Sequence, residues 1–418
     1  RVGTGLFDPA GGLELIDPSA TQGAIARGID SSGSVVTDGS NIVVISYDMR
    51  VLQNTVLAQL TNTAAVTQYA ATEGGPDFTG SGSLTDPAVI TIATNNLLHK
   101  ELVSTEIVDA FNANNEAVIG ELVTYRVTLT VPEATMPNAK IVDSLDNRNR
   151  LAFVEMVGVT SSPGISITGS TTPTVTNNGR TVTFDLGDIA NSDTDNAVAE
   201  TITLEYRAVV LNVQAAQGGS RVRNTARLTF DGLGNPRVAR AANVTIIEPN
   251  VAVDKQAAFD AGGTVGDASD PLTYTISLSN LPQASSATAD AFEVEFEDAL
   301  PVAVGGGSLV VSPTFTVSDP LGGLTAADFE LTGSDAAGWV LRSKAPFDLP
   351  VDALRTIEIE IHGSLPSSTS GLVTPGDLIS NAAHISWTSL PGLVAVPRST
   401  YNPDAVERTG AGGLNDYR

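Results

Sequence analysis

Apolar and polar residues alternate along several stretches of this chain, with the two-residue period of a β-strand. The alternation covers residues 41–51, 200–210 and 355–365, which read NIVVISYDMRV, ETITLEYRAVV and RTIEIEIHGSL. A strand buries every second side chain, so this period indicates half-buried antiparallel strands. Pieces such as TNNGRT and DGLGNP supply the turns between strands. The pattern predicts an all-β chain of tandem immunoglobulin-like antiparallel β-sandwiches, with one helical turn at most over 324–333.

A sequence repeat orders these strands. Three similar segments surround Asn62, Asn224 and Asn381, and they read LTNTAAV, VRNTARL and ISNAAHI. The three asparagines are 162 and 157 residues apart, which is long for one sandwich and leaves room for inserted loops.

The second and third copies also share a front half. Residues 97–107 align with 251–261, 121–131 with 271–281, and 139–148 with 294–303. We therefore predict a sandwich over residues 94–248 and another, with an extended C-terminal tail, over 249–418. Residues 1–93 resemble only the back half of a repeat and are predicted to form an incomplete first sandwich.

Composition restricts the class of protein. The formal net charge is −25, which disfavours binding to nucleic acid and to anionic lipid. Cysteine is absent, which excludes disulfides, thiolate metal sites and cysteine catalysis. The sequence contains no run of 18 apolar residues, so it predicts no membrane-spanning helix. Because the sequence begins at Arg1, we expect a processed piece of a longer, secreted or cell-surface precursor.

The ordered motifs resemble the repeat called domain of unknown function eleven, found in very large bacterial surface proteins. Copy three carries an early Lys255, then YTISLSN, DALP and NAAHIS, in the order typical of that family. Copy two keeps Lys100, YRVTL, DSLD and NTARL, but lacks the proline after Leu145 and the asparagine that ends the first of these strands. The resemblance implies an extracellular, adhesin-like or matrix-like protein and no enzymatic reaction.

That family is similar to the intramolecular isopeptide domains of pilins and adhesins, in which a first-strand lysine attacks a last-strand asparagine, assisted by a buried carboxyl group. Two of the four lysines occupy the aligned early position, and the lysine-to-asparagine separations are 124 and 126 residues. The resemblance predicts one bond from Lys100 to Asn224 assisted by Asp143, and one from Lys255 to Asn381 assisted by Asp298. Alternatively, the asparagines bond to the backbone and the lysines extend towards solvent.

Other candidate chemistry is sparse. Asp188, Asp193 and Asp195 in DLGDIANSDTDN could bind calcium, although the spacing fits no EF-hand and solvated turns explain the same residues. No nucleophile elbow, Walker loop or HExxH motif occurs, so we predict that the chain is not an enzyme and has no other cofactor.

The repeats and the interrupted ends together predict a function. An incomplete sandwich exposes strand edges, which a partner can cover by adding a strand. We therefore expect a structural subunit of an extracellular filament, sheath or surface layer. Copies of the chain would assemble head to tail by strand complementation, with residues 394–418 docking on residues 1–93 of the next copy. The alternative is an adhesin stalk or ligand-binding fragment of a giant tandem-repeat protein.

Overall fold

A computed structural model describes residues 7–8, 12–13, 47–49, 59–66, 76–79, 82–91, 96–194, 198–260, 262–283, 288–394, 396–411 and 417–418. The chain divides into two compact units, Arg1–Leu52 and Gln53–Arg418. In the first unit, β1 (Phe7–Asp8) pairs antiparallel with β2 (Gly12–Leu13). Most of the strand expected over 41–51 lies outside the described residues.

The second unit begins with a two-stranded hairpin. Its strands β3 (Gln59–Val66) and β4 (Leu84–Thr91) pair antiparallel, with Asn62 opposite Ala88. The remaining parts of the incomplete sandwich predicted over residues 1–93 lie largely outside the described residues.

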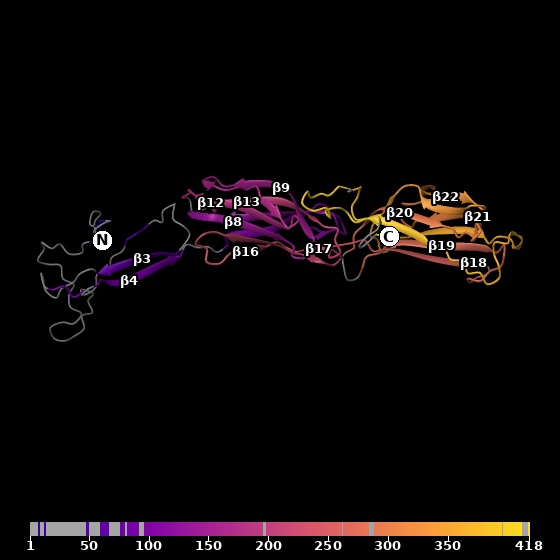
Figure 1. The fold of residues 1–418 in the computed structure, drawn as a ribbon, viewed down its shortest axis with the longest axis horizontal. Coiled ribbons are helices and arrows are strands. Elements are labelled where there is room, and N and C mark those ends of the chain that lie inside the picture. The colour runs from indigo at the N-terminus through magenta and orange to yellow at the C-terminus, as the bar shows by residue number, and fades with distance from the viewer. Residues whose placement is uncertain are drawn as a thin grey trace, which may run out of the picture. The chain divides into compact units, whose positions relative to one another are not determined.

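The copy-two sandwich, formed by β5 to β17, has two main sheets (Figure 1). The first has the order β5-β7-β13-β9, made of Leu98–Thr105, Leu122–Thr130, Thr201–Val210 and Leu151–Ser161. The second has the order β10-β12-β8-β15-β16, made of Ile165–Ile167, Thr181–Asn191, Thr135–Leu145, Asn224–Thr229 and Arg237–Arg240, with β11 (Thr174–Thr176) also paired to β12. A small sheet joins β14 (Arg221–Val222), β17 (Val244–Ile246) and β6 (Glu116–Ala117).

The copy-three sandwich, formed by β18 to β26, repeats this plan. Its first sheet has the order β18-β19-β25-β21, made of Val251–Phe259, Pro271–Asn280, Thr356–Ser364 and Val311–Ser318. Its second sheet has the order β22-β23-β20-β24, made of Phe329–Ser334, Gly338–Ser343, Ala291–Ala299 and Phe347–Leu349, with β26 (Ala383–Thr388) paired to the other edge of β20. Two short 3-10 turns, η1 (Ala326–Asp328) and η2 (Ser368–Ser370), complete it.

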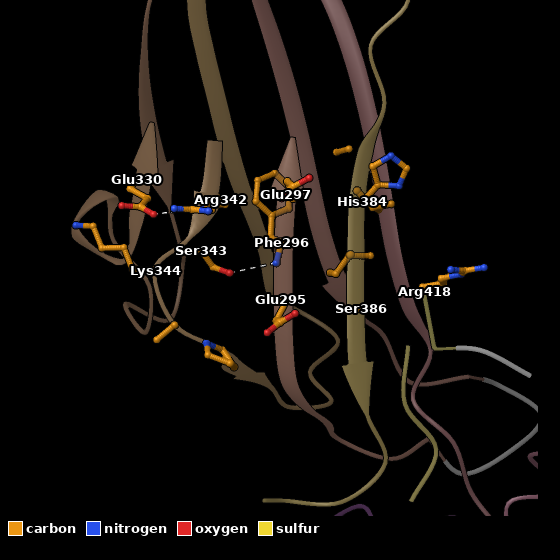
Figure 2. A pocket seen from close by; sticks show the side chains of 15 residues that line it. Glu295, Phe296, Glu297, Glu330, Arg342, Ser343, Lys344, His384, Ser386 and Arg418 are labelled. Atoms are coloured by element: carbon orange, nitrogen blue, oxygen red, sulfur yellow. Dashed lines mark hydrogen bonds and ion pairs between the residues drawn. The ribbon is translucent and has the colours of Figure 1, made fainter. Parts of the chain in front are cut away.

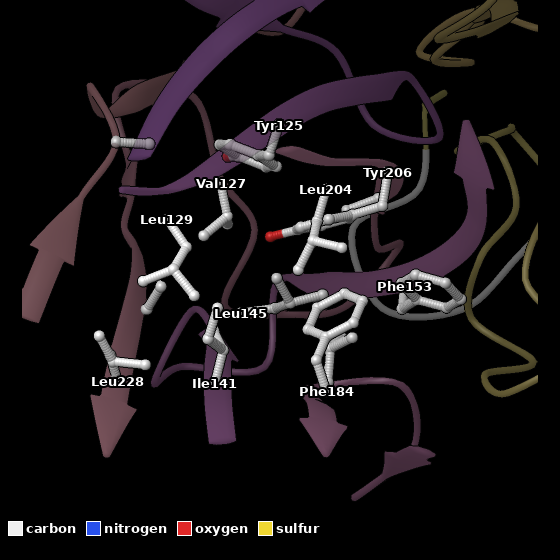
Figure 3. Close-up of a cluster of buried hydrophobic side chains, with 14 of the residues drawn as sticks. Tyr125, Val127, Leu129, Ile141, Leu145, Phe153, Phe184, Leu204, Tyr206 and Leu228 are labelled. Atoms are coloured by element: carbon white, nitrogen blue, oxygen red, sulfur yellow. The ribbon is translucent and has the colours of Figure 1, made fainter. Parts of the chain in front are cut away.

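The two-residue period explains the cores. In β7 the residues at every second position, from Val123 to Leu129, are buried, and β13 repeats the pattern from Ile202 to Ala208. Figure 3 shows these side chains meeting those of the facing sheet, including Ile141, Phe184 and Leu228. The all-β prediction and the strands expected in copies two and three are confirmed. No helix within the described ranges is long and apolar enough to cross a membrane.

Candidate functional site

Three polar residues stand where the strand period of copy two would place apolar ones. In β8 the inward positions are Ala139, Ile141, Asp143 and Leu145, and Asp143 is fully buried. Lys100 on β5 and Asn224 at the start of β15 are also inward, with exposures of 2% and 1%. Burying a charge is costly unless a partner compensates for the lost water. The sequence therefore places an amine, a carboxyl group and a carboxamide in the core.

The three side chains meet between the sheets. Lys100 Nζ contacts Asp143 Oδ2, and both side chains are wholly enclosed. Lys100 Nζ also donates to the hydroxyl of Tyr206 at 2.8 Å, and Asn224 Nδ2 donates to that same hydroxyl at 2.8 Å. The lysine and asparagine nitrogens, which come from opposite sheets, therefore both lie within hydrogen-bonding distance of one oxygen.

Two acceptor atoms in the copy-two cluster have no hydrogen-bond partner. Asp143 Oδ1 and Asn224 Oδ1 are both buried and unpaired. A proton on Asp143 would turn its carboxyl group into a donor, and the carbonyl oxygen of Asn224 is an acceptor in need of one. The cluster therefore leaves one carboxyl oxygen and the carboxamide oxygen buried without a donor.

Burial favours the neutral form of the lysine. It lowers the pKa of Lys100, although the nearby Asp143 opposes the shift. Removal from water disfavours the charged ammonium and so increases the fraction of the nucleophilic amine. The rings of Tyr125 and Tyr206 lie 5.3 and 5.2 Å from Nζ and complete the walls of the cluster.

Copy three contains the equivalent cluster. Lys255 Nζ contacts Asp298 Oδ2, and the ring of Tyr274 lies 4.8 Å from Nζ. Burial lowers the pKa of Lys255 and raises that of Asp298, against the attraction between the two groups. The Asn381 amide is near enough to oppose the shift at Asp298, yet neither of its polar atoms has hydrogen-bond geometry with a partner.

Strand register is identical in the two copies. Asp143 pairs with Ala226, and Asp298 pairs with Ala383, so each asparagine lies two residues before the partner of its aspartate. Such diagonal neighbours lie on one face of a sheet and within reach of each other. The structure thus brings together both residue sets that the sequence singled out, three from each copy.

Sequence reasoning missed Tyr206, which joins the copy-two cluster together. Tyr206 pairs with Tyr125 across the sheet, and in copy three Ile361 pairs with Tyr274 in the same register. Copy three therefore has an isoleucine where copy two has the bridging hydroxyl, and its asparagine amide lacks a bonded neighbour. Alignment of 200–210 with 355–365 contains this difference, but a tyrosine on an apolar face reads as ordinary core.

Two of the three residues considered for calcium, Asp188 and Asp193, lie in the described parts of the chain. Asp188 accepts the backbone N–H of Asn138 at 2.9 Å, and the backbone N–H of Asp193 donates to Asn191 Oδ1 at 3.0 Å. Asp195 lies outside the described residues. Among the described residues, no group of three or more His, Cys, Asp or Glu side chains could hold a metal ion.

A hollow of about 870 Å³ lies on the outer face of the copy-three sheet, over β20, β23 and β26 (Figure 2). Its charged lining mixes Glu330, which pairs with Arg342, with Lys344 and His384. Ser343 Oγ accepts the backbone N–H of Phe296 there. None of the six cluster residues lines this hollow.

No family model and no curated protein match the chain, so its resemblance to domain of unknown function eleven stays a prediction. Among solved structures it is similar to a C-terminal fragment of the major pilin of Streptococcus agalactiae, with 11% identity, a TM-score of 0.24, and coverage of 69% of this chain and 90% of that one. Domains D2 and D3 of the major pilin SpaD from Corynebacterium diphtheriae match with 13% identity, a TM-score of 0.24, and coverage of 72% and 85%. The pilus backbone of Streptococcus pneumoniae matches with 12% identity, a TM-score of 0.21, and coverage of 63% and 48%.

Proposed function

We propose that this chain is a non-enzymatic structural protein of an extracellular bacterial filament, sheath or surface layer, and that each complete sandwich closes itself with a lysine–asparagine isopeptide bond. One observation carries the proposal. The fully enclosed Lys100 amine contacts a buried carboxyl group and shares the Tyr206 hydroxyl with the Asn224 amide. A core gains nothing in hydrophobic burial from three such groups, so a reaction between them is the better reason for their presence.

The reaction needs no outside reagent. Neutral Lys100 Nζ attacks Cγ of Asn224, while protonated Asp143 donates to the amide oxygen and stabilises the negative charge that develops there. The amine then loses a proton, which the carboxyl group relays to the departing nitrogen. One N–C bond forms, one breaks, and ammonia leaves, with no change in oxidation state. Lys255, Asp298 and Asn381 would react in the same way.

Such bonds suit a chain without cysteine. Lys100 lies on the first strand of one sheet, and Asn224 lies on the opposite sheet near the end of the sandwich. A covalent link between them restrains most of the copy-two sequence in the unfolded state, as a disulfide would, and stabilises by roughly 4–5 kcal/mol for a loop of this length.

Intact mass of the denatured protein tests the bonds. Two bonds lower the mass by two ammonia molecules, about 17 Da each, relative to the sequence mass. Asn224→Ala and Asn381→Ala should each abolish one loss, and the double variant both. A chain of unshifted mass would refute the proposed crosslinks.

The assembly that we propose is head-to-tail addition of strands between copies of this chain. Its support is the edge of β26: the equivalent β15 carries β16 on its outer side, whereas the described residues give β26 no second strand, only a hydrogen bond from the Trp387 N–H to the Tyr417 carbonyl. Ser399 and Asn402 contact the copy-two sandwich of their own chain, and Tyr417 contacts β26. We therefore propose that the donor strand comes from a segment other than these residues.

Light scattering over a range of concentrations, followed by electron microscopy, tests assembly separately from the mass measurement. Growth of linear particles with concentration is expected. A monodisperse monomer at every concentration would contradict the assembly while leaving the crosslinks untouched.

A further inference from the structure

The segment that follows β26 leaves the copy-three sandwich and packs on the copy-two sandwich (Figure 1). We call residues 389–394 and 396–411 the strap. At its start, Ser389 is fully buried and donates from Oγ to the carbonyl of Ile119 at 2.7 Å. Leu390 enters a small apolar cluster with Val118, Ile247 and Ala289. The strap therefore begins by joining the two sandwiches at their junction.

The middle of the strap follows the surface of copy two. Ser399 Oγ donates to the carbonyl of Phe153 at 2.6 Å, and Asn402 Nδ2 donates to the carbonyl of Asn178 at 3.0 Å. Ala405 is fully buried against Ala152, Val209 and Leu211. This part of the strap uses backbone acceptors and a small apolar contact of copy two, as a built interface does.

Arg408 fastens the end of the strap. Its exposure is 1%, and its guanidinium group donates to Asn212 Oδ1 at 3.0 Å and to the carbonyls of Val213 at 3.2 Å and Ala216 at 3.0 Å. It also forms an ion pair with Glu248. A buried guanidinium group with all its neighbours in place is held in one geometry, and removal of one partner is costly.

Copy two also accommodates the strap in its backbone. Gly120 has φ +88°, and a Cβ placed there would lie 2.9 Å from Cα of Glu407. Only glycine permits both this conformation and this approach. The close fit shows that the junction loop of copy two is shaped for the strap.

The segments just before and just after the copy-three sandwich meet at Glu248. Glu248, just before β18, accepts from the hydroxyl of Tyr417 at 3.0 Å, and Arg408 pairs with the same carboxylate. Tyr417 stacks on Trp387 near the end of β26, with ring centroids 5.3 Å apart. Both ends of copy three are fastened to copy two.

From this geometry we propose that the strap carries tension from copy two directly to the C-terminal end. Copy three is then a side branch that lies outside the path of force. Tension along a chain acts only on segments between its points of attachment. While the strap holds, the segment from β18 to β26 lies outside those points. The inference goes beyond the crosslinks and the assembly, and it does not depend on either.

Single-molecule stretching of the full chain from handles at its two ends tests the strap. The parent should be Asn381→Ala, which cannot form the copy-three bond and whose loss removes no hydrogen bond of the folded state. Unfolding of β18 to β26 then releases roughly 3.3–3.6 Å per residue over residues 251–388, a length easily told from the short release of the strap. We expect the short release always to precede the long one.

Arg408→Ala should speed the short release at least roughly tenfold at a fixed force, because it removes the ion pair with Glu248 and the hydrogen bonds to the Val213 and Ala216 carbonyls. Arg207→Ala, which breaks only an exposed ion pair with Glu155 on copy two, is the matched control and should change nothing. If Arg408→Ala fails to fold, Ser399→Ala is the second variant. It removes the hydrogen bond from the strap to the Phe153 carbonyl and one from the Tyr401 N–H within the strap, and it should speed the release to a smaller extent. A long release without a short one before it, or identical rates in the parent and the strap variants, would overturn the inference.

Discussion

The hydroxyl of Tyr206 donates a hydrogen bond of 2.7 Å to Oδ2 of Asp143. The hydroxyl oxygen of Tyr206 in turn accepts hydrogen bonds from the side-chain nitrogens of Lys100 and Asn224. One phenol therefore touches all three groups that the proposed reaction needs, and burial raises its pKa well above the ordinary value, so it stays a proton donor. In the proposed reaction we assign Tyr206 the part of a positioning residue, since no bond to it forms or breaks.

Replacement of Tyr206 by phenylalanine should slow formation of the copy-two bond by roughly 10- to 100-fold, because both reacting side chains lose the oxygen that orients them. Mass spectrometry after refolding, over a time course, measures the ammonia loss. The Asn381→Ala background isolates the copy-two site.

Tyr125→Phe provides the matched control. The Tyr125 hydroxyl is buried without a hydrogen-bond partner, and its ring lies about as close to Lys100 Nζ as the ring of Tyr206. Its loss should leave the rate unchanged. Equal slowing by the two substitutions would mean that ring packing, not the hydroxyl bridge, sets the rate.

The two sites should also differ in the rate at which their bonds form. Ile361 in copy three provides no hydroxyl, and the Asn381 amide is not held by a hydrogen bond. We therefore expect the copy-three bond to form more slowly than the copy-two bond. Time courses on Asn224→Ala and Asn381→Ala follow each site alone, and a faster reaction in the variant that keeps only the copy-three site would contradict this order.

Loss of the copy-three bond should destabilise that sandwich by roughly 4–5 kcal/mol, the loop-closure term for a crosslink of this span. Asn381→Ala is a clean probe because its amide makes no hydrogen bond in the folded state. Lys255→Arg keeps the positive charge beside Asp298 but never supplies a neutral amine. The two variants should lower the denaturant midpoint of copy three similarly, and an unchanged midpoint in both would exclude a stabilising bond.

The strands could be predicted because a period of two fixes which side chains share a face. The two clusters were predicted from the aligned repeat and from the resemblance to isopeptide domains. Asp143 and Asp298 were singled out because the repeat aligns them and the resemblance implies an assisting carboxyl group. The structure places both at inward positions, on β8 and β20. Their approach to Lys100 and Lys255 followed from the aligned repeat.

The strap could not be predicted in the same way. Residues 389–411 have no strand period, and their contacts are made by side chains to backbone carbonyls such as those of Ile119 and Phe153. Backbone acceptors have no sequence signature. The sequence analysis assigned residues 394–418 to a neighbouring copy because the repeat is interrupted at both ends.

Glu121, next to the strap-contacting Gly120, should make stability depend on pH. Its side chain is buried, and burial raises its pKa to about 7 from 4.5, against hydrogen bonds from the Ile107 and Val118 N–H groups and from Asn112. Between those values the folded protein holds a proton that the unfolded chain has lost, so rising pH favours unfolding. The free energy of unfolding should fall by about 3 kcal/mol by pH 8.

Chemical denaturation at pH 5 and pH 8 measures this loss, with Glu121→Gln as the comparison. The glutamine cannot ionise, but its NH₂ group faces N–H donors, so the variant should be less stable than the native protein at pH 5. Because only the native protein pays to ionise a buried group, the gap between the two should shrink or reverse at pH 8. A gap of the same size at both pH values would show that Glu121 does not titrate in this range.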